Sequence, residues 1–132
     1  MSPFRDFSEL VFKTNKDRDY HIHLRQGSSE IVVTAVHGGG VEPLTSEVAA
    51  AIAGDEHSLY DLQGIRPANN DELRIPVANY DEMRLRFLLE RSQVCLSVEG
   101  VEGSDLAVHL GGRNRRLRTL LAERLQEAGF KA

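Results

Sequence analysis

Residues 30–47 read EIVVTAVHGGGVEPLTSE, and this stretch carries the strongest structural signal in the chain. Its first part, Glu30 to Val36, is apolar and rich in β-branched residues, which is typical of a buried strand. Three glycines follow His37, and Glu42 comes directly before a helix-start signal. The stretch therefore predicts a strand, a tight loop and a helix. It places an imidazole and a carboxylate at the carboxyl end of a strand, where α/β proteins usually bind ligands.

The rest of the chain alternates between strand and helix patterns. This alternation predicts an α/β fold, as a single compact domain over residues 1–132, with a mostly parallel or mixed sheet flanked by helices. We expect strands at 20–25, 30–36, 58–62, 73–77, 94–98 and 105–110, with 73–77 at an edge and 94–98 central. We expect helices within 4–13, from a Thr45 or Ser46 cap to Ile52, and from an Asp81 cap to about Ser92. A last helix should follow an Asn114 cap and end at Gly129, with Phe130 packed back on its last turn.

Composition limits the classes of function. Of the 132 residues, 41% are hydrophobic and 27% are charged, as in an ordinary globular protein, and the net charge of −4 argues against general nucleic-acid binding. No apolar stretch approaches membrane-spanning length, so no membrane partner is expected. The first residues lack an apolar signal core, which predicts a cytoplasmic location in the producing cell, with release by lysis as the route outside.

His37 and Glu42 are the first candidates for chemistry. Neutral histidine and carboxylate are both metal ligands, and the glycines let the backbone pass close to an ion held between them. The pattern also fits a structural alternative, in which His37 bonds to a loop carbonyl and Glu42 is an exposed loop acid. The residues alone leave both interpretations open.

The segment His37–Gly54, HGGGVEPLTSEVAAAIAG, resembles the signature of the phage-derived poly-γ-glutamate hydrolase family. The likeness continues through Ser58–Tyr60 and Leu73–Glu82, and it resumes at Gly111-Gly112 and at Ala128–Phe130. The resemblance implies a compact zinc peptidase fold similar to a trimmed carboxypeptidase A, with endo-hydrolysis of γ-glutamyl amide bonds. It also implies that His37 and Glu42 bind zinc.

The third zinc ligand of the family is a histidine in a motif that here reads Ser97-Val98-Glu99-Gly100. Three outcomes are open. In the first, Glu99 is itself a ligand, which weakens the Lewis acidity of the metal and shifts the preference from zinc toward manganese. In the second, His109 is the third ligand. In the third, the site is inactive and the fold is kept as a binding module. We favour Glu99, because it is itself a side chain that can bind a metal.

Three further residues complete the predicted site. Glu82 lies in the acidic pair Asp81-Glu82, which the family shares, and is the candidate general base, although capping of a helix would also explain it. Arg74 and Arg113 are candidates for binding substrate carboxylates, since guanidinium pairs with carboxylate in a bidentate way. Arg74 stands where the family typically has a histidine.

The leading hypothesis is a metal-dependent hydrolase of γ-glutamyl amide bonds. Its cofactor would be zinc or manganese and its partner an anionic γ-glutamyl polymer or peptide. The rival is a catalytically inactive relative that binds an acidic peptide or a partner protein. A third hypothesis is a hydrolase with another ion and another substrate, because the segment Leu73–Ala78 departs from the family pattern.

Overall fold

The computed structural model describes residues 3–132, and the chain within it separates into two compact units, one ending at Gly100 and the other spanning Val101–Ala132. The elements of the first unit are α1 (Phe7–Lys13), β1 (Tyr20–Arg25), β2 (Ile31–Gly39), α2 (Thr45–Ala53), β3 (Ser58–Gly64), the 3₁₀ helices η1 (Asn70–Leu73) and η2 (Val77–Asn79), α3 (Met83–Glu90) and β4 (Val94–Ser97). The second unit contains α4 (Arg115–Glu127). A single domain over 1–132 stays a prediction.

The first unit is built on a four-stranded mixed sheet in the order β1-β3-β2-β4. β2 is parallel to both of its neighbours, while β1 is antiparallel to β3. Thr34 on β2 is paired with Tyr60 on one side and with Ser97 on the other. Because parallel strands end at the same edge of a sheet, the carboxyl ends of β2, β3 and β4 come together there.

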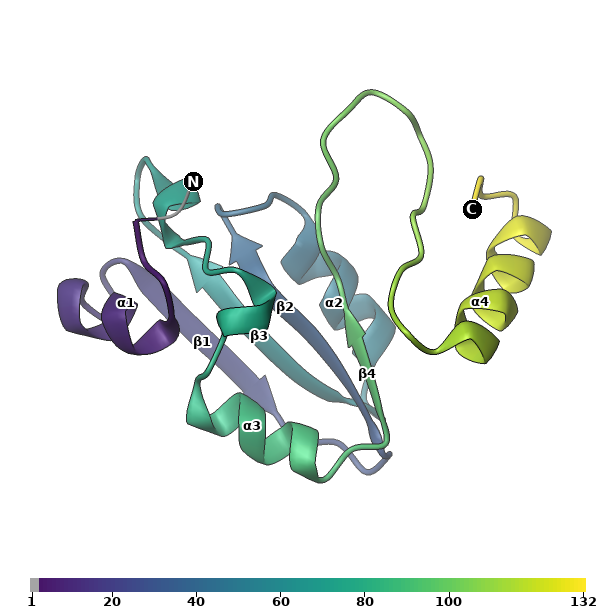
Figure 1. Ribbon diagram of the computed structural model, residues 1–132, viewed down its shortest axis with the longest axis horizontal. Coiled ribbons are helices and arrows are strands. Elements are labelled where there is room, and N and C mark those ends of the chain that lie inside the picture. Colours follow the sequence, from purple (N-terminus) through teal and green to yellow (C-terminus); the bar gives the residue numbers. More distant parts are fainter. Residues whose placement is uncertain (1–2) are drawn as a thin grey trace. The chain divides into compact units, whose positions relative to one another are not determined.

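Helices cover both faces of this sheet (Figure 1), as the alternating pattern predicts. On one face α2 packs small residues against β2 and β3, in a cluster formed by Val33, Ala35, Ala49, Ala53 and Leu59. On the other face α1, α3 and the segment after β3 build the larger core, which includes Leu10, Ile22, Val32, Tyr60, Leu62, Leu73, Ile75, Leu85 and Leu88. The α/β fold with a mixed, helix-flanked sheet is therefore confirmed.

Several predicted elements differ from the structure. Residues 73–77 form no strand, because η1 and η2 turn the chain on either side of Pro76. β4 lies at the edge of the sheet and not at its centre. The segment 105–110 has no regular structure.

Helix starts also differ from the sequence prediction. The N-cap of α3 is Glu82 and not Asp81. Asp81 instead accepts a hydrogen bond from the Phe7 amide at 2.9 Å, so it anchors the start of α1. The position before α2 is Leu44, with a left-handed φ of 76° and no side-chain cap, because Thr45 and Ser46 bond elsewhere.

The second unit begins after Gly100 and is organised around α4. Asn114 caps this helix as predicted, accepting a hydrogen bond from the Leu117 amide at 3.0 Å. The helix ends at Glu127, with Ala128 as its C-cap. Gly129 follows with a φ of 96°, and the Phe130 amide bonds back to the Leu125 carbonyl at 2.9 Å. This is the predicted glycine-terminated helix end.

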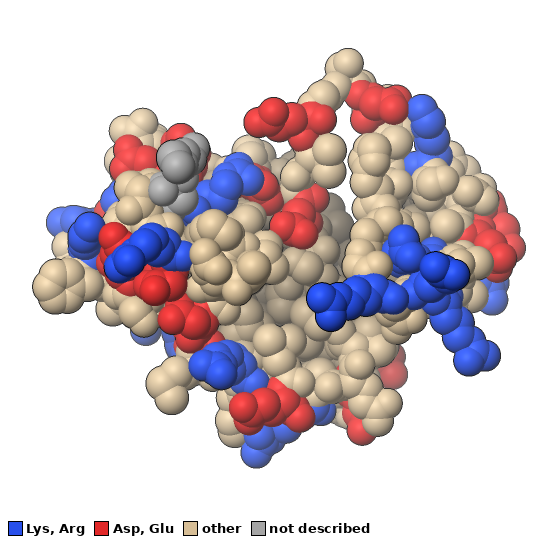
Figure 2. All heavy atoms as spheres, viewed as in Figure 1, with Lys and Arg blue, Asp and Glu red and all other residues tan. Residues whose placement is uncertain are grey.

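Charged side chains of both signs lie on the surface of the first unit (Figure 2). Figure 2 shows acidic and basic side chains interspersed over the viewed face of the first unit. Within residues 3–132, none of the helices combines the length and the apolar character that crossing a bilayer requires.

Candidate functional site

The loop after β2 folds back so that Glu42 lies against His37. The Glu42 amide donates to the His37 carbonyl at 2.9 Å. The Thr45 hydroxyl donates to the carbonyls of His37, at 3.2 Å, and Glu42, at 2.8 Å. Thr45 therefore closes the loop from its far end, instead of capping α2 as the sequence predicts.

Two of the glycines are required by close packing beneath this loop. A Cβ atom on Gly38 would lie 2.3 Å from both the Asp61 carboxylate and the Ser46 hydroxyl. Gly39 has a φ of 60°, a conformation that L-residues with side chains rarely adopt. The Ser46 hydroxyl accepts from the Gly39 amide at 2.8 Å and donates to buried Asp61 at 2.7 Å. This network fixes the backbone that presents His37.

The His37 ring is held with one nitrogen bonded and the other free. The side chain is buried, with 5% of the residue exposed, and Nε2 lies 2.6 Å from the Ile75 carbonyl. A carbonyl only accepts hydrogen bonds, so Nε2 bears the proton and Nδ1 presents its lone pair. Nδ1 is buried without a hydrogen-bond partner and lies 3.5 Å from Glu42 Oε1.

Glu42 has defined partners for both of its oxygens. The residue is 7% exposed, and Oε1 accepts a hydrogen bond from the Gly100 amide at 2.9 Å. Oε2 forms an ion pair with Nη1 of Arg74. A buried carboxylate needs such partners, because burying an unpaired charge is costly.

The pair His37 and Glu42 fits a divalent metal ion. A tetrahedral zinc ion with bonds of about 2.1 Å separates its ligand atoms by about 3.4 Å, and Nδ1 and Oε1 are 3.5 Å apart. Metal-binding histidines commonly donate their other N–H to a backbone carbonyl, as His37 does to Ile75. The structure therefore brings the predicted pair together, with the free lone pair of His37 Nδ1 next to the Glu42 carboxylate.

The third predicted ligand is placed differently. Glu99 is exposed, one residue after the Val98 amide bonds to the Thr34 carbonyl at 2.8 Å. Its neighbour Gly100 contacts Glu42, so Glu99 follows β4 at the correct edge of the sheet. Even so, within the part of the chain that the structure describes, no three side chains of His, Cys, Asp or Glu are grouped closely enough to hold a metal. Coordination by His37, Glu42 and Glu99 stays a prediction.

Glu82 belongs to a separate network. It accepts a hydrogen bond from the Tyr60 hydroxyl at 2.8 Å and from the Arg84 amide at 2.5 Å, where it caps α3. Burial raises the pKa of Tyr60 and of its neighbour Tyr80, so both phenols keep their protons at neutral pH. Among residues 3–132, no hydrogen bond or ion pair joins Glu82 to His37 or Glu42. The capping interpretation is therefore observed, and the role of general base stays a prediction.

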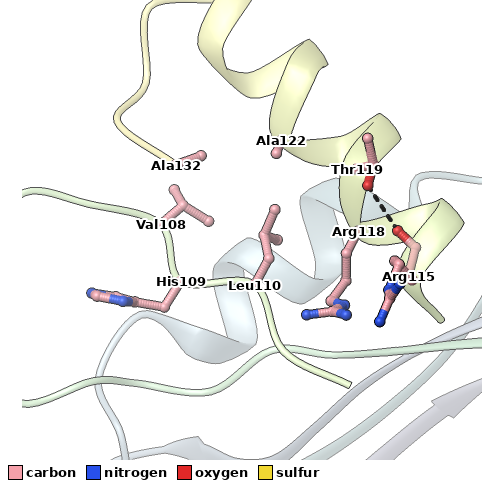
Figure 3. A pocket seen from close by; sticks show the side chains of 8 residues that line it. All are labelled: Val108, His109, Leu110, Arg115, Arg118, Thr119, Ala122 and Ala132. Carbon is pink, nitrogen blue, oxygen red and sulfur yellow. Dashed lines mark hydrogen bonds between the residues drawn. The ribbon is translucent and has the colours of Figure 1, made fainter. Parts of the chain in front are cut away.

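The two remaining residues lie in the second unit. His109, the alternative ligand, is on the irregular segment before α4, and Arg113 is exposed in the turn that precedes Asn114. This unit contains an open hollow of about 440 Å³. Its lining includes His109 from the irregular segment and Arg115 and Arg118 from α4 (Figure 3). Arg74, one of the two arginines predicted to bind substrate, lies in the first unit and forms an ion pair with Glu42.

The sequence prediction missed the supporting residues of the site. Asp61 and Gln63 on β3 form a hydrogen bond at 2.7 Å beside Ser46, and the Ile75 carbonyl orients His37. The signal for Asp61 was an acidic residue inside an otherwise apolar strand pattern, Ser58–Leu62. A backbone carbonyl such as that of Ile75 leaves no signal in the sequence.

Curated relatives of this chain come from Bacillus subtilis (strain 168). UPF0714 protein YndL is 35% identical over 130 residues, which cover 98% of this chain and 50% of YndL. SPbeta prophage-derived UPF0714 protein YoqZ is 31% identical over 129 residues, covering 98% of this chain and 46% of YoqZ. The chain thus spans about half the length of these relatives.

Solved structures and a family model agree with this relationship. Zinc-free YndL superposes with a TM-score of 0.94 at 32% identity, over 100% of this chain and 64% of that one. A bacteriophage poly-gamma-glutamate hydrolase superposes with a TM-score of 0.91 at 26% identity, over 100% of this chain and 65% of that one. The model of the family described as poly-gamma-glutamate hydrolase matches residues 4–132. This chain belongs to the poly-gamma-glutamate hydrolase family.

Proposed function

We propose that the protein is a metal-dependent hydrolase of γ-glutamyl amide bonds, with poly-γ-glutamate or a related γ-glutamyl peptide as its substrate. The observation that supports it most is the unsatisfied Nδ1 of His37, 3.5 Å from Glu42 Oε1, in a chain of this family. The zinc-free description of the solved YndL structure supports zinc as the ion. When bound, the ion supplies Lewis acidity for the scissile carbonyl and for the attacking water.

The residues of this chain would then have distinct tasks. His37 and Glu42 hold the ion, the Ile75 carbonyl fixes the tautomer of His37, and Glu99 supplies the third ligand from the end of β4. Manganese is the second candidate ion, since two carboxylates favour harder metals. Arg74 and Arg113 would pair with carboxylates of the anionic γ-glutamyl chain, and Glu82 would be the base.

Metal analysis tests the proposal directly. Protein purified without chelator or histidine tag should contain about one equivalent of zinc or manganese, because the paired donor atoms retain the ion. His37→Ala should lose it, and so should Glu42→Gln, which nearly keeps the side-chain volume. His21→Ala is the matched control, since His21 is a half-exposed histidine that pairs with Asp17 on the surface. Wild-type protein that stays metal-free in excess zinc would contradict the proposal.

The substrate needs its own measurement. Metal-loaded protein incubated with poly-γ-glutamate should shorten the polymer, as followed by size-exclusion chromatography. Unchanged polymer together with stoichiometric metal would remove the substrate and keep the metal site.

A binding module without catalysis is the second candidate. It is favoured by the Arg74–Glu42 ion pair, which neutralises the buried carboxylate without any metal, and by the exposure of Glu99. Metal-free protein that binds a γ-glutamyl peptide and leaves it intact would support this function.

A further inference from the structure

We propose that Arg74 is an internal counter-ion that competes with the metal for Glu42, and that metal binding releases its guanidinium for an anionic ligand. This inference rests on the proposed metal site and deepens it. It concerns how one arginine of this chain links the two kinds of ligand.

The placement of Arg74 supports competition. Its guanidinium pairs with Oε2 of Glu42, while Oε1 of the same carboxylate faces the free Nδ1 of His37. The other contact of the carboxylate comes from the neutral Gly100 amide. Among the described residues, Arg74 is thus the permanently charged side chain that forms an ion pair with Glu42, whereas His37 faces the carboxylate with the lone pair of Nδ1.

Two cations on one carboxylate oppose each other. A guanidinium and a divalent ion held about 6 Å apart repel strongly enough to change a binding constant about tenfold, even at the dielectric constant of water. The ion therefore binds more weakly while Arg74 stays in place. Removing the positive charge of Arg74 should tighten metal binding by about this factor.

Exposure indicates which partner moves. The Arg74 side chain is 43% exposed and that of Glu42 is 9% exposed, so the guanidinium has access to solvent whereas the carboxylate is fixed. The backbone of Arg74 is held in place independently, since its amide bonds to the Asp71 carbonyl at 3.2 Å at the end of η1. Displacement by the ion would leave the guanidinium at the mouth of the site, free to pair with a carboxylate.

Such an exchange makes metal and anion binding cooperative. If the metal frees Arg74, then an anion on Arg74 also favours the metal, because thermodynamic linkage is reciprocal. Arg74 is then a positioning residue for the anion in the metal-bound protein, and a blocking residue for the metal when no anion is present.

Zinc titration of the intact chain by calorimetry at low ionic strength tests the competition. Arg74→Gln should bind zinc about tenfold more tightly than wild type, and Arg74→Lys, which keeps the charge, should show a smaller gain. Arg84→Gln is the matched control, because Arg84 is also a half-exposed arginine paired with a buried glutamate, Glu82. It should leave zinc affinity unchanged. Circular dichroism and thermal unfolding of each variant show that it is folded.

The outcomes separate the two proposals. Wild type that binds zinc, with Arg74→Gln equal or weaker, overturns the competition and leaves the metal site intact. Zinc binding that appears only in Arg74→Gln supports the competition, and it contradicts the proposal that wild-type protein works as a metal-dependent hydrolase. No zinc binding by either protein overturns the metal site, and the competition with it.

A second titration tests the release of Arg74. Glutarate, a dicarboxylate probe, should bind wild type more tightly with zinc than without it, and most of this gain should disappear in Arg74→Gln. A zinc-dependent gain that is equal in both proteins would mean that glutarate binds the ion alone, and it would overturn the release.

Discussion

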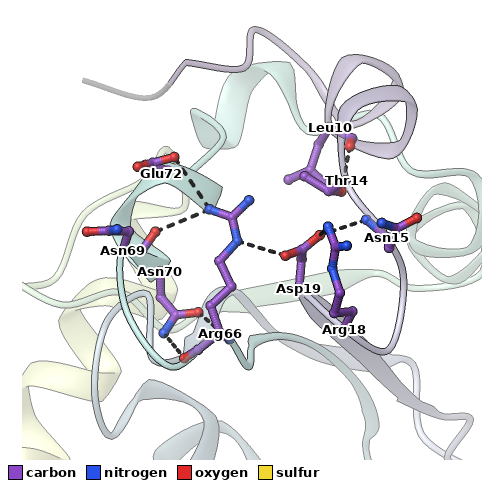
Figure 4. Close-up of polar contacts among 9 residues, drawn as sticks. All are labelled: Leu10, Thr14, Asn15, Arg18, Asp19, Arg66, Asn69, Asn70 and Glu72. Atoms are coloured by element: carbon purple, nitrogen blue, oxygen red, sulfur yellow. Dashed lines mark hydrogen bonds and ion pairs between the residues drawn. The ribbon is translucent and has the colours of Figure 1, made fainter.

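At the level of single residues, hydrogen bonds and ion pairs lower the pKa of the Asp19 carboxyl group. The Asp19 carboxylate accepts the Asn15 amide at 2.7 Å and lies 3.0–3.1 Å from Arg66 and Arg18 (Figure 4). The Asn15 hydrogen bond, helped by the two arginines and opposed by burial, lowers the pKa of Asp19 to about 2. Asp19 therefore joins the segment before β1 to Arg66, which follows β3.

This lowered pKa predicts an acid dependence of stability. Because the pKa of Asp19 is lower in the folded state, its contribution is present above the unfolded value of about 4 and is lost as pH falls toward about 2. Asp19→Asn should cost about 2 kcal/mol of unfolding free energy near neutral pH, and less near the acid limit. Urea unfolding of wild type and Asp19→Asn, from neutral pH down to the acid limit, measures this difference in unfolding free energy. A cost that does not change with pH would show that the charge of Asp19 is not the cause.

Glu82 offers a test of catalysis against structure at a single position. As a cap of α3 and acceptor of the Tyr60 hydroxyl, it predicts that Glu82→Gln lowers stability by about 1–2 kcal/mol and leaves zinc affinity unchanged. Chemical unfolding and zinc titration give both quantities. A loss of polymer hydrolysis of more than about hundredfold in folded, zinc-loaded protein would instead support the general base.

At the scale of elements, the turn from β2 to α2 depends on backbone packing. Gly38 sits where the register of β2 against β3 shifts, between Ala35 and Gly38, and its missing side chain leaves room for Asp61 and Ser46. The site is therefore built on an irregular strand end and not on a flexible loop. Such bulges often occur next to functional sites.

Gly38→Ala should break this turn. The new Cβ would meet the Asp61 and Ser46 oxygens at 2.3 Å and separate two buried, hydrogen-bonded side chains, so we expect a loss of about 2–3 kcal/mol in unfolding free energy. Zinc affinity should fall with it. Gly111→Ala is the matched control, because the methyl group added there would meet no atom within 4 Å and its φ is not positive. Equal stability of both variants would contradict the packing argument.

Sequence patterns predicted some elements well because their signals are local. Periodicity predicts the strands at 20–25 and 30–36 and the glycine-ended helix after Asn114. Short spacing along the chain predicts that His37 and Glu42 lie close together. The apolar residues of segment 73–77 predict an extended strand, yet Leu73 and Ile75 enter the core from turns. The Arg74–Glu42 and Tyr60–Glu82 contacts join residues 32 and 22 positions apart, so only the folded chain reveals them.

For the whole molecule, the superpositions on solved relatives support the fold more strongly than the geometry of the site supports a function. The superpositions cover all of this chain but less than two thirds of each solved relative. The fold of the matched part is shared, together with the edge of the sheet that holds His37 and Glu42. The proposed metal site therefore depends on the residues that this chain itself has at that edge, so metal content is the first measurement to make.

Arg74 and Ile75 are neighbours in the chain, and one contacts the carboxylate while the other contacts the imidazole. A small displacement of this dipeptide would disturb both the His37 imidazole and the Glu42 carboxylate. Substitutions near the dipeptide should therefore be non-additive with substitutions at His37 or Glu42. A laboratory selection for tighter ion retention should therefore yield paired substitutions, one near this dipeptide and one near His37 or Glu42.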